Sequence, residues 1–164
     1  MTHELVSANN ATQVVEFFRH QFKNPDQWCD LDELILRLNS QIPNEVIGVA
    51  DIEDNRVVGA VIAYRNPFSS IEWTIPIVAI EKGNPETELP SLRRQGRGRE
   101  LMARIYQEII TRGGKSVLAD TNKDHKMGGS PEFLQAVGLT QLCELPGYFE
   151  NDANQTGLLF IRHL

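Results

Sequence analysis

The chain has 164 residues, with 16 Lys and Arg against 22 Asp and Glu, so its formal net charge is −6. This acidic balance argues against a nucleic-acid-binding domain, because such domains usually carry a basic surface. Hydrophobic residues make up 41% of the chain, and no apolar run is long enough to cross a membrane. Length and composition predict one soluble domain over residues 1–164.

The N-terminal part is expected to form one short strand and two helices. Residues 3–7 are compatible with a strand, and apolar residues recur at helical spacing over 11–23. Asp30 and Glu33 have the spacing of a capping box, which predicts that a second helix begins here and stops at Pro43.

Three adjacent strands are expected next. Two apolar runs, 45–52 and 56–64, flank the turn pair Asp54-Asn55, which favours a hairpin. A third run, 71–81, contains Pro76, and a proline inside a strand usually marks a bulge or a broken pairing. Because a strand–helix–strand unit follows these strands, the order predicts a mixed sheet flanked by helices.

The segment 92–102 carries the strongest chemical signal. It packs two glycines and four arginines into seven residues, after the strand 71–81 and before a helical pattern over about 99–112. Glycine lets the backbone approach a ligand, and the first turn of a helix leaves N–H groups unpaired at the positive end of its dipole. The segment therefore predicts an anion site, with a phosphorylated cofactor as the expected ligand.

The spacing within this segment limits which phosphorylated cofactor is expected. It fits neither the phosphate-binding P-loop pattern nor the Gly-x-Gly-x-x-Gly dinucleotide pattern. Arg93-x-x-Gly96-x-Gly98 resembles the Arg/Gln-x-x-Gly-x-Gly/Ala motif of the GNAT superfamily of N-acetyltransferases. The later features resemble that family in order: a helix, a strand over 116–120, a short helix ending at Phe133-Leu134-Gln135-Ala136-Val137-Gly138-Leu139, and a tail with Tyr148 before a last strand over 158–161.

The resemblance implies a fold and a cofactor. The fold would be a mixed, mostly antiparallel central sheet of about six or seven strands, and acetyl-CoA would be the co-substrate, with no metal. Asn122 matches a region that often contacts the pantetheine arm, although it is equally suited to cap a turn. The remaining cofactor-binding residues form two groups, one for the pantetheine arm and one for the phosphates: Val78, Ala79 and Ile80; and Arg93, Arg94, Gln95, Gly96, Arg97, Gly98 and Arg99.

The resemblance also implies a reaction, the direct transfer of an acetyl group to a primary amine on a small molecule, peptide or protein. Tyr148 matches a tyrosine that many family members place near the thiol, and a phenol with a pKa near 10 is protonated at neutral pH. The candidate base is Glu72, which strand alternation places on one face with Thr74 and Val78. Glu81 and ordered water are the other candidates for removing the amine proton.

Two departures from the family pattern keep alternatives open. Leu134 stands where the family has a tyrosine, and 82–90 lengthens the link before the motif. A CoA-binding sensor without catalysis and an RNA-associated protein both remain possible readings. Cys29 and Cys143 are far apart in the sequence and lack a Cys-x-x-Cys spacing. We therefore interpret them as reduced, buried or incidental thiols of a cytoplasmic protein. Family members often form homodimers, and the sequence indicates neither the acceptor nor the acyl length.

Overall fold

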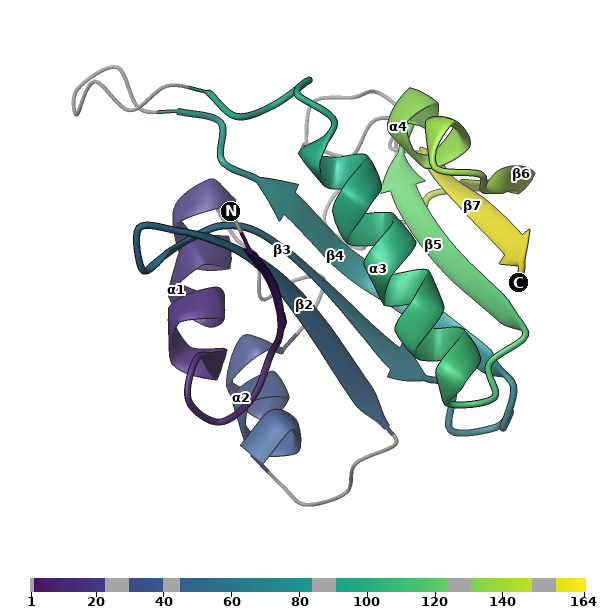
Figure 1. The fold of residues 1–164 in the computed structure, drawn as a ribbon. Helices are drawn as coiled ribbons and strands as arrows, with labels where there is room; N and C mark the ends of the chain where they lie inside the picture. Colours follow the sequence, from purple (N-terminus) through teal and green to yellow (C-terminus); the bar gives the residue numbers. More distant parts are fainter. Residues whose placement is uncertain (1, 23–29, 40–44, 84–90, 124–130, 149–155) are drawn as a thin grey trace.

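The computed structural model describes residues 2–22, 30–39, 45–83, 91–123, 131–148 and 156–164. Seven strands form one sheet in the order β1-β2-β3-β4-β5-β7-β6, and all neighbours are antiparallel except β4 and β5 (Figure 1). This confirms the expected mixed, mostly antiparallel sheet. The elements are β1 (Thr2–Leu5), α1 (Ala11–Gln21), α2 (Leu31–Asn39), β2 (Val46–Glu53), β3 (Arg56–Arg65), β4 (Glu72–Ile80), α3 (Arg97–Thr111), β5 (Ser116–Asn122), α4 (Pro131–Ala136), β6 (Thr140–Pro146) and β7 (Thr156–His163).

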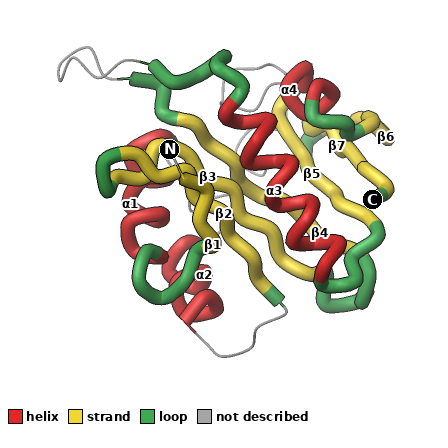
Figure 2. Tube along the Cα trace, viewed as in Figure 1, coloured by secondary structure: helices red, strands yellow, loops and turns green. Residues whose placement is uncertain are grey.

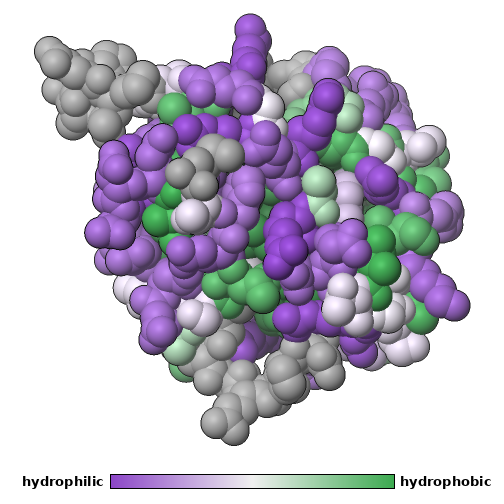
Figure 3. All heavy atoms as spheres, viewed as in Figure 1, coloured by the Kyte–Doolittle hydropathy of each residue, from purple (hydrophilic) through white to green (hydrophobic). Residues whose placement is uncertain are grey.

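Helices pack on both faces of this sheet (Figure 2), and each face has its own hydrophobic core. The α3 core includes Val49, Val61, Trp73, Ile75, Leu101, Met102, Ile105, Ile109, Val117, Ala119, Leu134, Leu158 and Phe160. The α1–α2 core includes Val14, Val15, Phe18, Leu31, Ala50, Ala60, Ile62, Ile77 and Ala79. We refer to the two faces as the α3 side and the α1–α2 side. Hydrophilic residues dominate the surface over α3, as expected for an amphipathic helix (Figure 3).

Local signals in the sequence act as predicted. The backbone N–H of Glu33 donates to Asp30 Oδ1 at 2.9 Å, which caps α2. Asp54 and Asn55 have φ angles of 50° and 61°, as a tight hairpin turn requires, and Pro131 is the first residue of α4. Pro43 and residues 84–90 lie outside the described part of the chain.

Pro76 lies in a bulge of β4, as one of the two readings of this proline predicts. Ile62 of β3 is opposite Ile77, but Tyr64 is opposite Thr74, so β4 has one residue more than β3 in this interval. On its other side, β4 pairs with β5 only from Glu72 to Thr74. Beyond that point the two strands diverge, and Figure 1 shows their arrowheads well apart.

The bulge also reverses which side chains of β4 face which core. Trp73 and Ile75 belong to the α3 core, whereas Ile77 and Ala79 belong to the α1–α2 core. Val78 consequently packs on the α3 side. The prediction that Glu72 and Thr74 share a face with Val78 is therefore wrong, because the extra residue breaks the period of two.

The C-terminal part differs from the prediction in two further respects. β5 extends to Asn122, so this residue ends a strand and does not follow one. β6 was not expected as a strand, because its side chains are mostly exposed and show no hydrophobic alternation. It pairs only with β7 and forms one edge of the sheet.

Candidate active site

The predicted anion site falls at the first turn of α3. Gly96 is the N-cap with a φ of 86°, and the N–H groups of Arg99 and Glu100 donate to its carbonyl oxygen at 2.9 and 3.2 Å. In the part of the chain that the structure describes, the N–H groups of Gly96, Arg97 and Gly98 have no backbone or side-chain acceptor. Three donors at the positive end of a 15-residue helix suit a phosphate.

The two glycines of the motif serve different purposes. A Cβ built on Gly96 meets no heavy atom within 4 Å, so the space in front of the loop is open on this side. A Cβ on Gly98 would lie 2.9 Å from Cε2 of Phe133, a side chain of α4. Gly96 therefore supplies the left-handed backbone and ligand access, whereas Gly98 allows α4 to dock beside the loop.

The arginines around these glycines point to different partners. Arg94 and Arg99 are exposed, and neither side chain has a hydrogen-bond or ion-pair partner among the described residues. Arg93 donates from Nε to the carbonyl oxygen of Ile80 at 3.3 Å, which ties the loop to the end of β4. The amide of Gln95 donates to the carbonyl oxygen of Ser91 at 3.1 Å and closes the turn. Arg94 and Arg99 are thus the side chains best placed to add positive charge to a bound phosphate.

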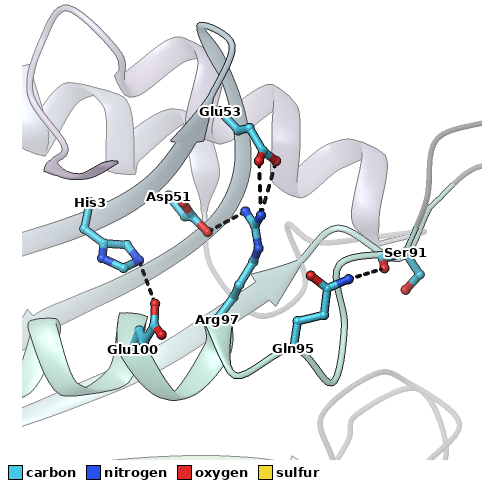
Figure 4. A network of polar contacts seen from close by, with 7 residues as sticks. All are labelled: His3, Asp51, Glu53, Ser91, Gln95, Arg97 and Glu100. Carbon is cyan, nitrogen blue, oxygen red and sulfur yellow. Dashed lines mark hydrogen bonds and ion pairs between the residues drawn. The ribbon is translucent and has the colours of Figure 1, made fainter. Parts of the chain in front are cut away.

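Arg97 is directed away from the anion site and anchors the loop (Figure 4). Its guanidinium lies 3.1 Å from Asp51 and 3.2 Å from Glu53, both on β2. Asp51 is fully buried, and 12% of the Arg97 side chain is exposed. The expectation that the arginine side chains contact phosphate is therefore not met by Arg97, although its backbone N–H remains in the site.

Replacing Arg97 with glutamine should destabilise the fold by about 3 kcal/mol, because it leaves the Asp51 carboxylate buried without its cation. The matched variant Arg94→Gln changes the same side chain at an exposed position and should change stability by less than about 0.5 kcal/mol. Urea unfolding of both variants measures the difference. Equal unfolding free energies would contradict the anchoring role of Arg97.

The divergent half of β4 provides backbone groups beside this loop. Residues 78–80 pair with residues 59–61 of β3 on one side, while pairing with β5 has already ended at Thr74. Apart from the Ile80 carbonyl oxygen, which accepts from Arg93, this part of β4 is therefore available on its β5 side to the amide groups of an extended ligand, as in strand addition. Val78, Ala79 and Ile80 are the residues predicted for the pantetheine arm.

Tyr148 lies on the α1–α2 side of β7, close to the divergence. A Cβ built on Gly157 would be 2.7 Å from Cδ1 of Tyr148, so the ring rests on this glycine. Gly157 is opposite Asn122, and Leu159, two residues further along β7, is opposite Asp120. Partial burial raises the pKa of the Tyr148 phenol, and the negative charge of Asp120 raises it further. Tyr148 and Asp120 are therefore near each other.

Both glutamates that were candidates for the base already have a side-chain partner. Glu72 lies at the closed end of the two strands, opposite Ser116, and its carboxylate accepts a hydrogen bond from the Asn66 side chain. Glu81 is buried and forms an ion pair with Arg56. Sequence reasoning missed Asp120, whose burial raises its pKa.

Several other residues lie in the hydrophobic core or away from the candidate site. Trp73 is fully buried, and Leu134, which stands where the family has a tyrosine, packs into the α3 core. Cys143 is exposed on β6, so it is not a buried thiol, whereas Cys29 lies outside the described residues.

Among the described residues there is no group of three or more His, Cys, Asp or Glu side chains suited to a metal ion. No described helix has the length and apolar character needed to span a membrane.

Comparison with known proteins gives a family and a fold. A model of the acetyltransferase (GNAT) family matches residues 11–127. No curated protein sequence gives a significant match.

Solved structures resemble the chain over nearly its whole length. An aminoglycoside 6′-N-acetyltransferase from Enterococcus faecium is 17% identical with a TM-score of 0.74, and 99% of this chain and 97% of that one are covered. An aminoglycoside 6′-N-acetyltransferase complexed with coenzyme A, 16% identical, gives the same TM-score and coverage. Ard1 from Thermoplasma volcanium is 20% identical with a TM-score of 0.66, again over 99% and 97% of the two chains.

Proposed function

This chain belongs to the acetyltransferase (GNAT) family, and from that premise we propose that it transfers an acetyl group from acetyl-CoA directly to a primary amine. It would do so as a single domain over residues 1–164. The observation that carries the proposal is the divergence of β4 and β5 at the Pro76 bulge, with the first turn of α3 beside it. The N–H groups at the start of α3 and the edge of β4 beyond Thr74 thus lie together, which supports binding of a long phosphorylated thioester.

The residues at the start of α3 fit acetyl-CoA. The N–H groups of Gly96, Arg97 and Gly98 would hold the pyrophosphate, and Arg94 and Arg99 would add charge. The bound thioester supplies an activated acetyl carbon and a thiolate leaving group. A neighbouring protein of the same fold is described as complexed with coenzyme A.

The chain also offers groups for the transfer itself. Proline has no N–H, so Pro76 cannot polarise the thioester oxygen, and a backbone N–H within residues 77–80 of β4 would do so. The Tyr148 phenol would protonate the leaving thiolate. Cys143 lies on the edge strand β6, two strands away from β5, which favours direct transfer over a thioester on the enzyme.

A primary amine is the acceptor that this family reading supports. Two of the solved structures are aminoglycoside 6′-N-acetyltransferases, which makes an aminoglycoside a sensible first candidate. The acidic balance of the chain, with a net charge of −6, favours cationic acceptors by long-range attraction.

Calorimetric titration with acetyl-CoA and with CoA, followed by a thiol-release assay, tests the proposal. The amine panel would hold an aminoglycoside with a 6′-amine, a polyamine and a lysine-containing peptide. Micromolar binding and thiol release with one amine class are expected. Binding without release on any amine would instead support a CoA sensor, and absence of binding would refute the cofactor site.

A further inference from the structure

Asp120 occupies a distinctive position in the divergence between β4 and β5. The last paired residues of these strands are Thr74 and Leu118, and Asp120 is two residues further along β5. Ala119 faces the α3 core, so strand alternation places Leu118 and Asp120 on the opposite, α1–α2 side. Asp120 therefore lies on the same side as Tyr148, just where the two strands have separated.

Among the described residues, Asp120 has no positively charged partner. Its carboxylate is partly buried. Burial raises its pKa, and a hydrogen bond from its own backbone N–H offsets part of this effect. Lys123, which follows β5, is engaged in an ion pair with Glu144 of β6. A partly buried carboxylate without a counter-ion is a natural partner for an ammonium group.

We propose that Asp120 binds the ammonium group of the acceptor and removes its proton, so that the natural acceptor is an aliphatic primary amine that is charged in solution. The inference rests on the proposed acetyltransferase function and assigns the base of that reaction to Asp120 instead of Glu72. Glu72 is less suited because it sits at the closed end of the strands and is already hydrogen-bonded to Asn66.

The proton balance of the transfer is complete with Asp120 and Tyr148. The Asp120 carboxylate takes one proton from the ammonium group, and the free amine nitrogen forms its bond to the acetyl carbon. The carbon–sulfur bond breaks, the phenol of Tyr148 gives its proton to the thiolate, and the phenolate takes up the second proton lost by the nitrogen. The products are the acetamide and the thiol of CoA, and Asp120 releases its proton to water.

The order of these steps suits the electrostatics. While Asp120 is ionised, its charge raises the pKa of Tyr148. Once Asp120 has accepted the amine proton, that charge is gone and the phenol becomes a stronger acid. The acid is thus strengthened just before it must donate.

Asp120→Asn tests this assignment by removing the base while keeping the shape of the side chain. We expect kcat/KM for the accepted amine to fall roughly 100-fold or more near neutral pH, with unchanged acetyl-CoA affinity. The loss should shrink about tenfold per pH unit toward about pH 10, because solution then supplies the free amine. In the described part of the chain, Tyr148 is the titratable group whose pKa responds to the charge of Asp120.

Three further variants help to interpret the result. Glu144→Gln makes the same chemical change at an exposed residue of β6 and should leave kcat/KM within about twofold, because a surface ion pair contributes little. Glu72→Gln tests the rival base and should have a smaller effect than Asp120→Asn. Asp120→Glu retains the carboxylate and should recover part of the activity.

The possible outcomes are distinct. An equal loss at every pH, or a pH-reversible loss in Glu72→Gln and not in Asp120→Asn, would overturn the assignment. Thiol release by the wild type on some amine, with Asp120→Asn unaffected, would refute Asp120 alone and keep the proposed function. If the wild-type protein binds acetyl-CoA but releases thiol with no amine, the proposed function itself fails. Retained acetyl-CoA binding by each variant shows that it is folded.

Discussion

Replacing Gly96 with aspartate is expected to abolish acetyl-CoA binding in a protein that still folds. The new carboxylate would stand in the open space before the unpaired N–H groups of the α3 N-terminus, where it competes with phosphate and repels it. Loss of several charge-assisted hydrogen bonds, each contributing about 1.5–3 kcal/mol, corresponds to an affinity loss of roughly 100-fold or more.

Gly113 supplies a matched control for this variant. It follows the other end of the same helix, has a φ of 80° against 86° for Gly96, and likewise has no atom within 4 Å of a built Cβ. Gly113→Asp thus carries similar backbone strain without touching the phosphate site. Calorimetric titration of both variants with acetyl-CoA checks the prediction. Normal affinity in folded Gly96→Asp, or equal losses in both, would mean that the loop does not bind the cofactor.

Replacing Tyr148 with phenylalanine should reduce kcat by about 100-fold or more with little change in acetyl-CoA affinity. The ring would still rest on Gly157, so only the proton donor is removed. Because burial and Asp120 raise the pKa of Tyr148 above its usual value near 10, the phenol stays protonated throughout the neutral range. Deprotonation of Tyr148 should therefore cause no fall in wild-type activity below about pH 10.

Tyr106→Phe is the control for this experiment. Tyr106 is buried in the α3 core, with the Arg162 guanidinium over its ring, and burial raises its pKa to about 12. It therefore lies on the opposite side of the sheet from Tyr148. Single-turnover kinetics with saturating acetyl-CoA separates the chemical step from binding in both variants. Wild-type rates in Tyr148→Phe would remove Tyr148 as the acid.

Asp120→Asn should leave the protein at least as stable as the wild type at neutral pH. A carboxyl group whose pKa is raised in the folded state holds its proton more tightly there than in the unfolded chain, so stability falls as pH rises through that range. An uncharged amide avoids this penalty. Such a position is typical of a side chain retained for activity, because activity and stability often conflict.

Much of the architecture could be predicted because its signals are local. The capping spacing of Asp30 and Glu33, the Asp54-Asn55 turn and the glycines before α3 each specify a conformation through neighbouring residues. The order of these elements then limits the sheet to few arrangements. β6 escaped prediction because an exposed edge strand has no hydrophobic face to reveal its period.

The parts of the site that were missed depend on distant partners. Arg97 appears equivalent to its neighbours in sequence, and only the fold brings it to Asp51 and Glu53, more than forty residues earlier. Asp120 has no flanking motif, and its importance comes from strand divergence and from Tyr148. The face reversal after the bulge likewise requires the register of β3, which a single strand does not disclose.

With Pro76, β4 contains one residue more than regular pairing with β3 requires. Without it, Ile75 would lie opposite Ala63, the ladder from Ile62 to Tyr64 would run without interruption, and Ile77 would still face the α1–α2 core. A shortened chain would thus keep both cores and gain a regular strand, but lose the local distortion at which β4 leaves β5. Because both cores would be intact, an unfolding measurement on such a protein would show a normal fold. A one-residue deletion is therefore a route by which a lineage could become a stable, inactive relative.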